Sequence, residues 1–304
     1  MFYDIIVIMV TVGIPRALLF HYYGDKWVEF FNQLGVKTVT SPPTNREIVK
    51  RGIALSVDEA CFSSKLYLGH VDWLVGKCDM LFSLRMENVG IREDFCPRIF
   101  GMQDVTRHTF PNLKLLHADV NYIMRKREVD AFIQIGAQLG FDAEKSKQAF
   151  LAADVFANKK RQAEIAEQEQ KLNNPGLRVL LVSHAYNIAD AYIGRDIVEY
   201  FKKQNITTIF AHQKNKTKPE NKRLYWTINA EIMGGVEMYQ NRVDGIVLVT
   251  TFPCGPDSIF NEMLIRSTTK PVLSLMVDEL DASAGLQTRL ESFVDILTAR
   301  EVKK

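Results

Sequence analysis

The chain has 304 residues, of which 47% are hydrophobic and 24% charged, a balance typical of a globular protein long enough for two domains. Its formal net charge of +2 is too small to indicate a nucleic-acid partner or an anionic membrane surface. Four cysteines in a chain of this length do not form a disulfide framework, so we expect a reducing, cytoplasmic location.

The N-terminal residues form an apolar run that Asp4 interrupts. The run is too short to span a bilayer, and it has no basic leader of the kind that precedes a secretory signal. We interpret it as a buried first strand, with the native start at Met1 or at Met9.

Strand and helix patterns then alternate through the first part of the chain. Large apolar side chains recur at i, i+3, i+4 and i+7 from Trp27 to Leu34, which predicts an amphipathic helix that ends at Gly35. The other expected elements are strands at 10–14, 36–40, 80–84 and 113–116 and a helix at 65–75. This β–α alternation favours a parallel sheet covered by helices.

Residues 125–175 are predicted to be a helical connector. The mixed-sign run from Lys159 to Lys171 is typical of a solvated helix face with i,i+4 charge pairs. A nucleic-acid role is disfavoured because its basic residues are not segregated. The segment Asn173–Gly176 should then break the helix.

A second α/β unit follows, with strands expected at 178–184, 207–211, 244–251 and 271–277 and a helix at 193–201. The predicted fold class is therefore α/β, with two Rossmann-like, flavodoxin-like parallel-sheet domains joined by a helical segment. We expect an N-terminal domain at 1–124 with Cys61 and Cys96, the connector at 125–175, and a C-terminal domain at 176–304 with Cys254. Chemistry in such sheets collects beyond the carboxyl ends of the strands.

Three of the four cysteines, Cys61, Cys96 and Cys254, lie in loop-like contexts next to regular structure. No two of them form a C-x-x-C pair, so only folding can bring them together. Three converging thiolates predict a metal or iron–sulfur site with one coordination position free. The fourth, Cys78, leads directly into a buried strand and is expected to pack.

Cys254 follows a predicted strand and precedes Gly255–Ser258, a typical helix start. A thiolate there should gain from the helix dipole, which lowers its pKa and favours ligation. The alternative is a small buried hydrophobic residue. Ser63 or Ser64 is expected to cap the helix that follows Cys61.

The residue types available as ligands distinguish a zinc site from an iron–sulfur cluster. Zinc would need His70 or His108 beside the thiolates, and the closely spaced pair usual in structural zinc sites is missing. A [4Fe–4S] cluster is held by thiolates and accepts ligands far apart in the sequence. A catalytic cysteine with a histidine base remains open, although no nucleophile signature surrounds any of the three. Since Walker A and G-x-G-x-x-G patterns are absent, we do not expect the chain to hydrolyse ATP itself.

Five further side chains are candidates for contacts to the bound group or to a substrate. They are Lys65 and His70 on the helix after Cys61, Arg98 next to Cys96, and His184 and Asn187 after the first strand of the second domain. Arg98 would offset the negative charge of a cluster. A structural cap remains the alternative for His184 and Asn187.

Six motifs stand in order along residues 10–298, and together they resemble the 2-hydroxyacyl-CoA dehydratase component family. The resemblance is closest to the activase-related branch, found fused or adjacent to the activating ATPase. The motifs are Gly13–Leu18, Cys61-x-x-x-Lys65 with Gly69–Val71, Phe95–Arg98, His184–Asn187, Phe252-x-Cys254–Asp257, and Asp278-Glu279 with Thr288–Glu291.

The resemblance implies two α/β domains with a [4Fe–4S] cluster between them, carried by Cys61, Cys96 and Cys254. It also implies a partner ATPase, carrying its own iron–sulfur cluster, that injects one low-potential electron. In true dehydratases that electron generates a ketyl radical from a thioester, whereas related members carry a double-cubane [8Fe–9S] cluster and reduce small molecules. Relatives suggest a homodimer or a pair with a related subunit.

Three functions follow as expectations. The first is an iron–sulfur component of a dehydratase-like lyase or an ATP-dependent reductase. The second is an electron-transfer or cluster-carrying module without catalysis, and the third is a zinc-stabilised binding protein. No CoA-binding feature is recognisable in the sequence.

Overall fold

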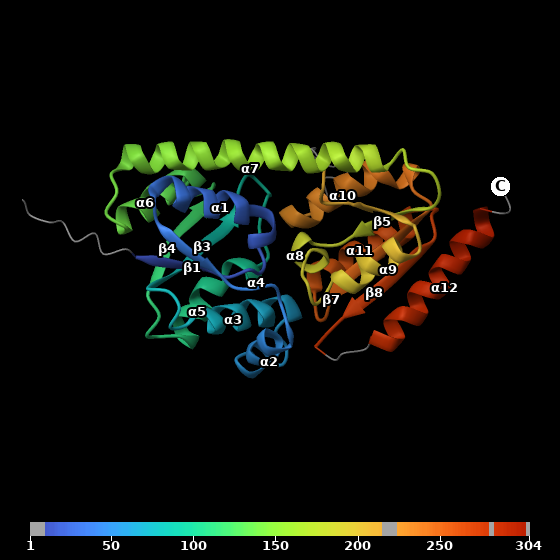
Figure 1. Cartoon of the computed structure of the whole chain (residues 1–304), viewed down its shortest axis with the longest axis horizontal. Coiled ribbons are helices and arrows are strands. Elements are labelled where there is room, and N and C mark those ends of the chain that lie inside the picture. The colour runs from blue at the N-terminus through green and yellow to red at the C-terminus, as the bar shows by residue number, and fades with distance from the viewer. Residues whose placement is uncertain (1–9, 215–223, 280–282, 302–304) are drawn as a thin grey trace, which may run out of the picture.

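The chain folds into two lobes, each built on a four-stranded parallel sheet (Figure 1). The computed structural model describes residues 10–214, 224–279 and 283–301, so the predicted strand before Val10 and both candidate start positions lie outside the described residues. The first sheet has the order β2-β1-β3-β4 and the second the order β6-β5-β7-β8. Both orders confirm the predicted α/β fold class with two parallel-sheet domains.

The strands of the first sheet are β1 (Thr11–Ile14), β2 (Lys37–Thr40), β3 (Met80–Asn88) and β4 (Leu115–Asn121). Those of the second are β5 (Arg178–Val182), β6 (Thr207–Phe210), β7 (Gly245–Thr251) and β8 (Val272–Val277). The helices before the second sheet are α1 (Phe20–Leu34), α2 (Arg46–Ala54), α3 (Phe62–Leu74), α4 (Pro97–Phe100), α5 (Met102–Thr109), α6 (Glu128–Gln138) and α7 (Ala143–Lys171). Those within and after it are α8 (Ala185–Ile188), α9 (Arg195–Lys203), α10 (Thr227–Tyr239), the 3₁₀ turn η1 (Gln240–Arg242), α11 (Gly255–Ser267) and α12 (Ser283–Glu301).

Both faces of the second sheet are buried, as the continuous apolar runs predict for parallel strands. Side chains of successive residues on β5 point to opposite faces. Leu180 and Val182 pack with α10 and α11, whereas Val179 and Leu181 pack with α9 and α12. The strands are therefore held in register by two separate apolar layers.

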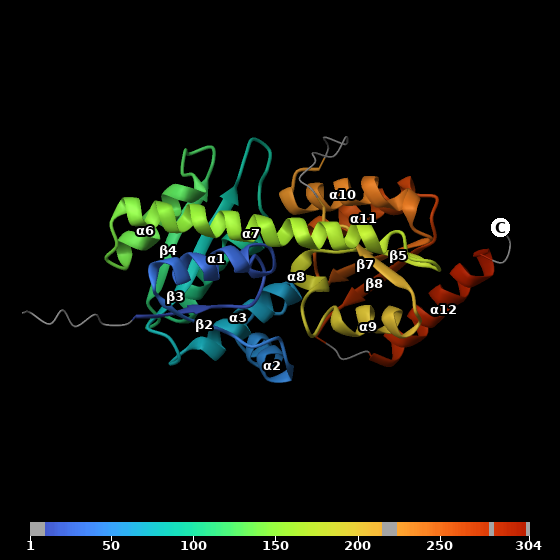
Figure 2. The same ribbon diagram turned by 45° about the horizontal axis from the view of Figure 1, so that its top comes forward.

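The long helix α7 joins the lobes, running along both of them (Figures 1 and 2). Its 29 residues span about 43 Å at 1.5 Å per residue. Near its start Ala149 and Phe150 are buried against the first lobe, and near its end Gln168 exchanges hydrogen bonds with the backbone of Phe210 on β6. Most of the charged run from Lys159 to Lys171 is exposed or half-buried, as expected. The proposed domain boundaries on either side of 125–175 stay predictions.

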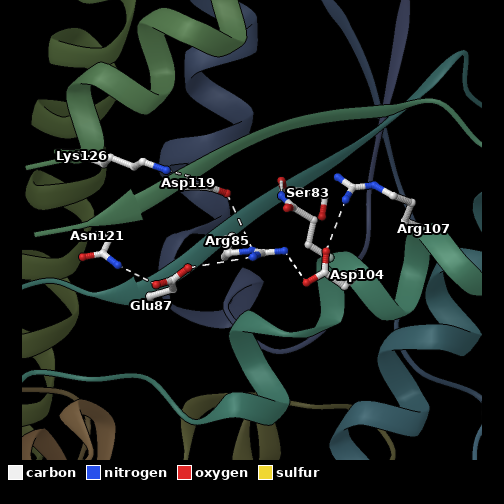
Figure 3. A network of polar contacts seen from close by, with 9 residues as sticks. Ser83, Arg85, Glu87, Asp104, Arg107, Asp119, Asn121 and Lys126 are labelled. Carbon is white, nitrogen blue, oxygen red and sulfur yellow. Dashed lines mark hydrogen bonds and ion pairs between the residues drawn. The ribbon is translucent and has the colours of Figure 1, made fainter. Parts of the chain in front are cut away.

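A network of ion pairs ties β3, β4 and α5 together (Figure 3). The Arg85 guanidinium lies 2.5 Å from the Asp104 carboxylate and 3.8 Å from that of Asp119. Lys126 also pairs with Asp119, at 3.1 Å. Each carboxylate of this cluster thus faces a cation of the chain, which favours a structural role that fixes the end of β3, where the segment carrying Cys96 begins.

Within the described residues, no helix is both long and apolar enough to cross a membrane.

Candidate functional site

The three predicted cysteines each lie immediately before a helix. Cys61 is the N-cap residue of α3, Cys96 that of α4 and Cys254 that of α11. The expectation that Ser63 or Ser64 caps the helix after Cys61 is wrong, because α3 already begins at Phe62. All three cysteines line one cavity between the lobes, of about 560 Å³ including space open to solvent. Each of them is a free thiol.

Hydrogen bonds across the lobes bring Cys61 and Cys254 to this cavity. The backbone N–H of Phe62 donates to the carbonyl of Phe252 at 2.9 Å. Next to it, the Ser63 hydroxyl donates to Oδ1 of Asn187 at 2.8 Å and lies 2.9 Å from the Thr251 hydroxyl. The start of α3 is therefore joined both to the end of β7 and to α8.

Cys96 is positioned by a chain segment that folds back on β3. The backbone N–H of Phe95 donates to the Glu87 carbonyl at 2.8 Å, and Pro97 occupies the first turn of α4, where proline is favoured. The Thr227 N–H donates to the Asp94 carbonyl at 2.9 Å, which ties this segment to α10 of the second lobe. Cys96 thus reaches the same cavity from a third direction.

The pKa of the Cys254 thiol differs from the prediction. Burial raises its pKa, and the charge of Asp257 raises it further, so the expected lowering by the helix start is wrong. The backbone N–H of Asp257 does favour the thiolate, but burial outweighs it. Burial likewise raises the pKa of Cys96.

Mutual repulsion adds to this effect. The charges of Cys61 and Cys96 both raise the pKa of Cys254. Buried thiolates that repel one another are stabilised when a positively charged metal centre lies among them. The three thiols therefore fit a metal or iron–sulfur group that is bound through thiolates.

A histidine and a carboxylate complete the wall of the cavity on the side of the second lobe. His184 lines the cavity, and its Nε2 lies 2.8 Å from Oδ1 of Asp257. Asn229 donates to the same oxygen at 2.9 Å, and the Tyr186 ring stacks on the imidazole with centroids 4.7 Å apart. Potential ligand atoms of His184, Cys254 and Asp257 all lie within 4.8 Å of one another.

Asp257 is the functional candidate to which sequence reasoning assigned no role. Burial raises its pKa, but the charge of His184 and the hydrogen bonds from His184 and Asn229 outweigh burial, so the pKa is lowered overall. The carboxylate is thus ionised at neutral pH. Its position in the first turn of the helix after Cys254 was the available signal.

Of the five further candidates, Arg98 and His184 line the cavity, and Asn187 is one hydrogen bond away through Ser63. Lys65 instead pairs with Glu279 at 2.6 Å and is not among the lining residues. His70 is buried between Ser41 and Thr44, outside the lining, and burial lowers its pKa to about 3.

The two remaining candidates from the sequence lie elsewhere. His108 is exposed on α5, away from the lining residues. Cys78 packs against the core next to Gly13, as predicted. A side chain at Gly13 would come within 2.6 Å of the Cys78 sulfur, so the two residues fill one small space.

Comparison with known protein families identifies a family for this chain. Residues 11–213 match the family described as "CoA enzyme activase uncharacterised domain (DUF2229)". No protein with a curated description matches the chain. Among solved structures, the C-terminal domain of glucosamine-fructose-6-phosphate aminotransferase from Francisella tularensis is similar at 10% identity, with 96% of this chain and 85% of that chain covered and a TM-score of 0.26. That likeness is too low to carry an argument.

Proposed function

This chain belongs to the CoA enzyme activase uncharacterised domain family, and on that premise we propose that it is an iron–sulfur protein working with an activator ATPase. Cys61, Cys96 and Cys254 would hold a [4Fe–4S] cluster between the lobes. The chain would accept low-potential electrons from the ATPase, itself an iron–sulfur protein, for reductive or radical chemistry on a small substrate.

The observation that carries the proposal is the convergence of three free thiols on one interlobe cavity from three separate helix starts. Thiols spaced this far apart in the sequence reach one cavity because contacts between the lobes, among them the hydrogen bond from Phe62 to Phe252, fix the relative position of the lobes. A bound [4Fe–4S] cluster would supply one-electron redox chemistry at low potential. The protein's own residues would hold it, and the buried wall formed by Phe95, Ile99 and Tyr186 would limit the access of water.

The test uses the full chain, purified without oxygen, together with the ATPase and ATP. We expect the reduced-cluster EPR signal of the chain to grow only when ATP is hydrolysed. A panel of 2-hydroxyacyl-CoA thioesters is then added, and their turnover is measured to determine whether the electron is used in catalysis. Reduction without turnover of any thioester supports the electron-carrier function, and failure of the ATPase to reduce a loaded cluster contradicts the proposal.

A zinc-stabilised binding module is the second candidate, and His184 favours it. Three cysteines and one histidine form a complete tetrahedral set for structural zinc. Metal and acid-labile sulfide analysis separates the two: about four irons with sulfide support a single cubane, whereas one zinc without sulfide supports the module. About eight irons per chain would indicate the double-cubane cluster.

A further inference from the structure

We propose that Nδ1 of His184 is the fourth protein ligand of the group held by Cys61, Cys96 and Cys254, and that Asp257 holds the imidazole in the ligating tautomer. This inference rests on the proposed function, since it assigns the coordination position that the three thiols leave free.

One ring nitrogen of His184 is buried and has no hydrogen-bond partner among the described residues. The side chain of His184 is only 4% exposed, and the nitrogen without a partner is Nδ1. A buried polar atom left in this way costs free energy that native proteins rarely tolerate without a reason. Since the ring lines the cavity with the three cysteines, a bound metal centre is the partner that the site offers.

The contact with Asp257 fixes the tautomer of His184. An ionised carboxylate only accepts hydrogen bonds, so the contact between Nε2 of His184 and Oδ1 of Asp257 places the ring proton on Nε2. The neutral imidazole then carries its lone pair on Nδ1. Asn229 also donates to this oxygen, so Oδ1 of Asp257 acts as a hydrogen-bond acceptor toward both neighbours.

Asp257 and Tyr186 also fix the orientation of the His184 ring. Metal-bound histidines usually donate their other ring N–H to a carboxylate, which fixes the ring and raises its basicity as a ligand. His184 and Asp257 have this relationship, and the Tyr186 ring, stacked at an interplanar angle of 7°, holds the imidazole plane. One ring nitrogen of His184 lies within 4.8 Å of the Cys254 sulfur, so the imidazole stands beside a thiol of the site.

The test is spectroscopic and does not depend on turnover. The full chain is labelled with nitrogen-15 histidine, loaded with iron and sulfide without oxygen, reduced, and measured by pulsed EPR. We expect a strongly coupled histidine nitrogen in the wild type and in His108→Gln, an exposed control, and its loss in His184→Ala. In Asp257→Asn the amide can donate to Nε2 and shift the ring proton to Nδ1, so we expect the coupling to weaken.

The possible results separate this proposal from the proposed function. A chain that carries iron and sulfide but shows no strongly coupled nitrogen in the wild type overturns His184 as the ligand and leaves the proposed function standing. Coupling that survives in His184→Ala has the same meaning. Should His184→Ala fail to fold, the labelled wild type and Asp257→Asn still decide.

A chain that holds zinc and no sulfide contradicts the proposed function. The zinc is then exchanged for cobalt, and the same nitrogen measurement is repeated. A histidine coupling that disappears in His184→Ala supports the ligand, and its absence from the wild type overturns it.

Discussion

The backbone N–H of Phe62, the residue after Cys61, donates a hydrogen bond at 2.9 Å to the carbonyl of Phe252, two residues before Cys254. One bond therefore joins the start of α3 in the first lobe to the end of β7 in the second. The relative position of two thiols is fixed by the register of the lobes, so changes at the lobe interface should affect the site.

Ser63→Ala removes a buried hydroxyl that bonds Asn187 and Thr251. Because both partners lose a hydrogen-bond partner inside the interface, we expect the free energy of unfolding to fall by about 1–3 kcal/mol, measured by denaturant titration. Ser292→Ala on the exposed face of α12 is the matched control and should stay within about 0.5 kcal/mol of wild type. Equal effects of the two substitutions would argue against a stabilising role for the interface.

Gly52→Ala should loosen the packing of α2 on α3. A side chain at position 52 would lie 2.1 Å from the Lys65 carbonyl oxygen, so the two helices must separate. We expect a loss of about 1–3 kcal/mol or more in thermal or denaturant unfolding, as for other overpacked sites. Gly285→Ala meets nothing within 4 Å, and in the first turn of α12 it should be neutral or stabilise by up to about 0.5 kcal/mol. A destabilising Gly285→Ala would show that open space around a glycine is a poor guide in this chain.

Glu279→Gln should be more damaging than Lys65→Met, although the two residues form one ion pair of 2.6 Å. The Lys65 side chain is 5% exposed and Glu279 33% exposed, so loss of the carboxylate leaves a buried ammonium without a partner, whereas loss of the ammonium leaves a carboxylate that reaches water. We expect costs of about 3 and about 1 kcal/mol, measured in a double-mutant cycle.

Glu262→Gln provides the control for this pair. Its partner Arg266 is 77% exposed, and breaking such a surface pair should cost less than about 0.5 kcal/mol. An equal cost for Glu279→Gln and Lys65→Met would contradict the argument from burial.

Stability should fall as the pH is lowered from neutrality. Burial lowers the pKa of His70 from 6.5 to about 3 and those of His21 and His212 from 6.5 to about 4. Below pH 6.5 the unfolded chain binds protons at these histidines and the folded chain does not, so each contributes a loss of up to about 1.4 kcal/mol per pH unit. The loss continues down to the folded pKa and is absent above pH 6.5.

Unfolding titrations between pH 7 and pH 5 measure that slope. His70→Asn should reduce it, because one buried imidazole is gone, and the exposed His108→Gln should leave it unchanged. A stability that rises as the pH falls through this range would contradict burial of neutral histidines.

The sequence predicted most of the strands because buried parallel strands contain continuous apolar runs, as from Val179 to Val182, although the strand expected at 113–116 overlaps β4 only at its first two residues. It also predicted the end of α1 at Gly35, which has a φ of 74°. It missed α2, a short helix whose signal was local: Asn45 caps it by accepting from the backbone of Glu47 and Ile48.

The candidate site was predictable only in part. The loop contexts of the cysteines indicated which thiols face a cavity, and Cys78 was correctly set apart. The partnership of His184 with Asp257 joins residues 73 positions apart, and no local pattern reports it. Lys65 and His70 were grouped with Cys61 because they share α3. The Lys65 ammonium instead pairs with Glu279, the His70 ring lies between Ser41 and Thr44, and neither residue lines the cavity.

Metal and sulfide analysis of the chain purified without oxygen, wild type beside four single Cys→Ser variants, tests the central claim most directly. The account predicts about four irons and four sulfides in the wild type and in Cys78→Ser, and a clear loss of both in Cys61→Ser, Cys96→Ser and Cys254→Ser. Zinc without sulfide in the wild type, or full iron and sulfide in the Cys61→Ser, Cys96→Ser and Cys254→Ser variants, would contradict it.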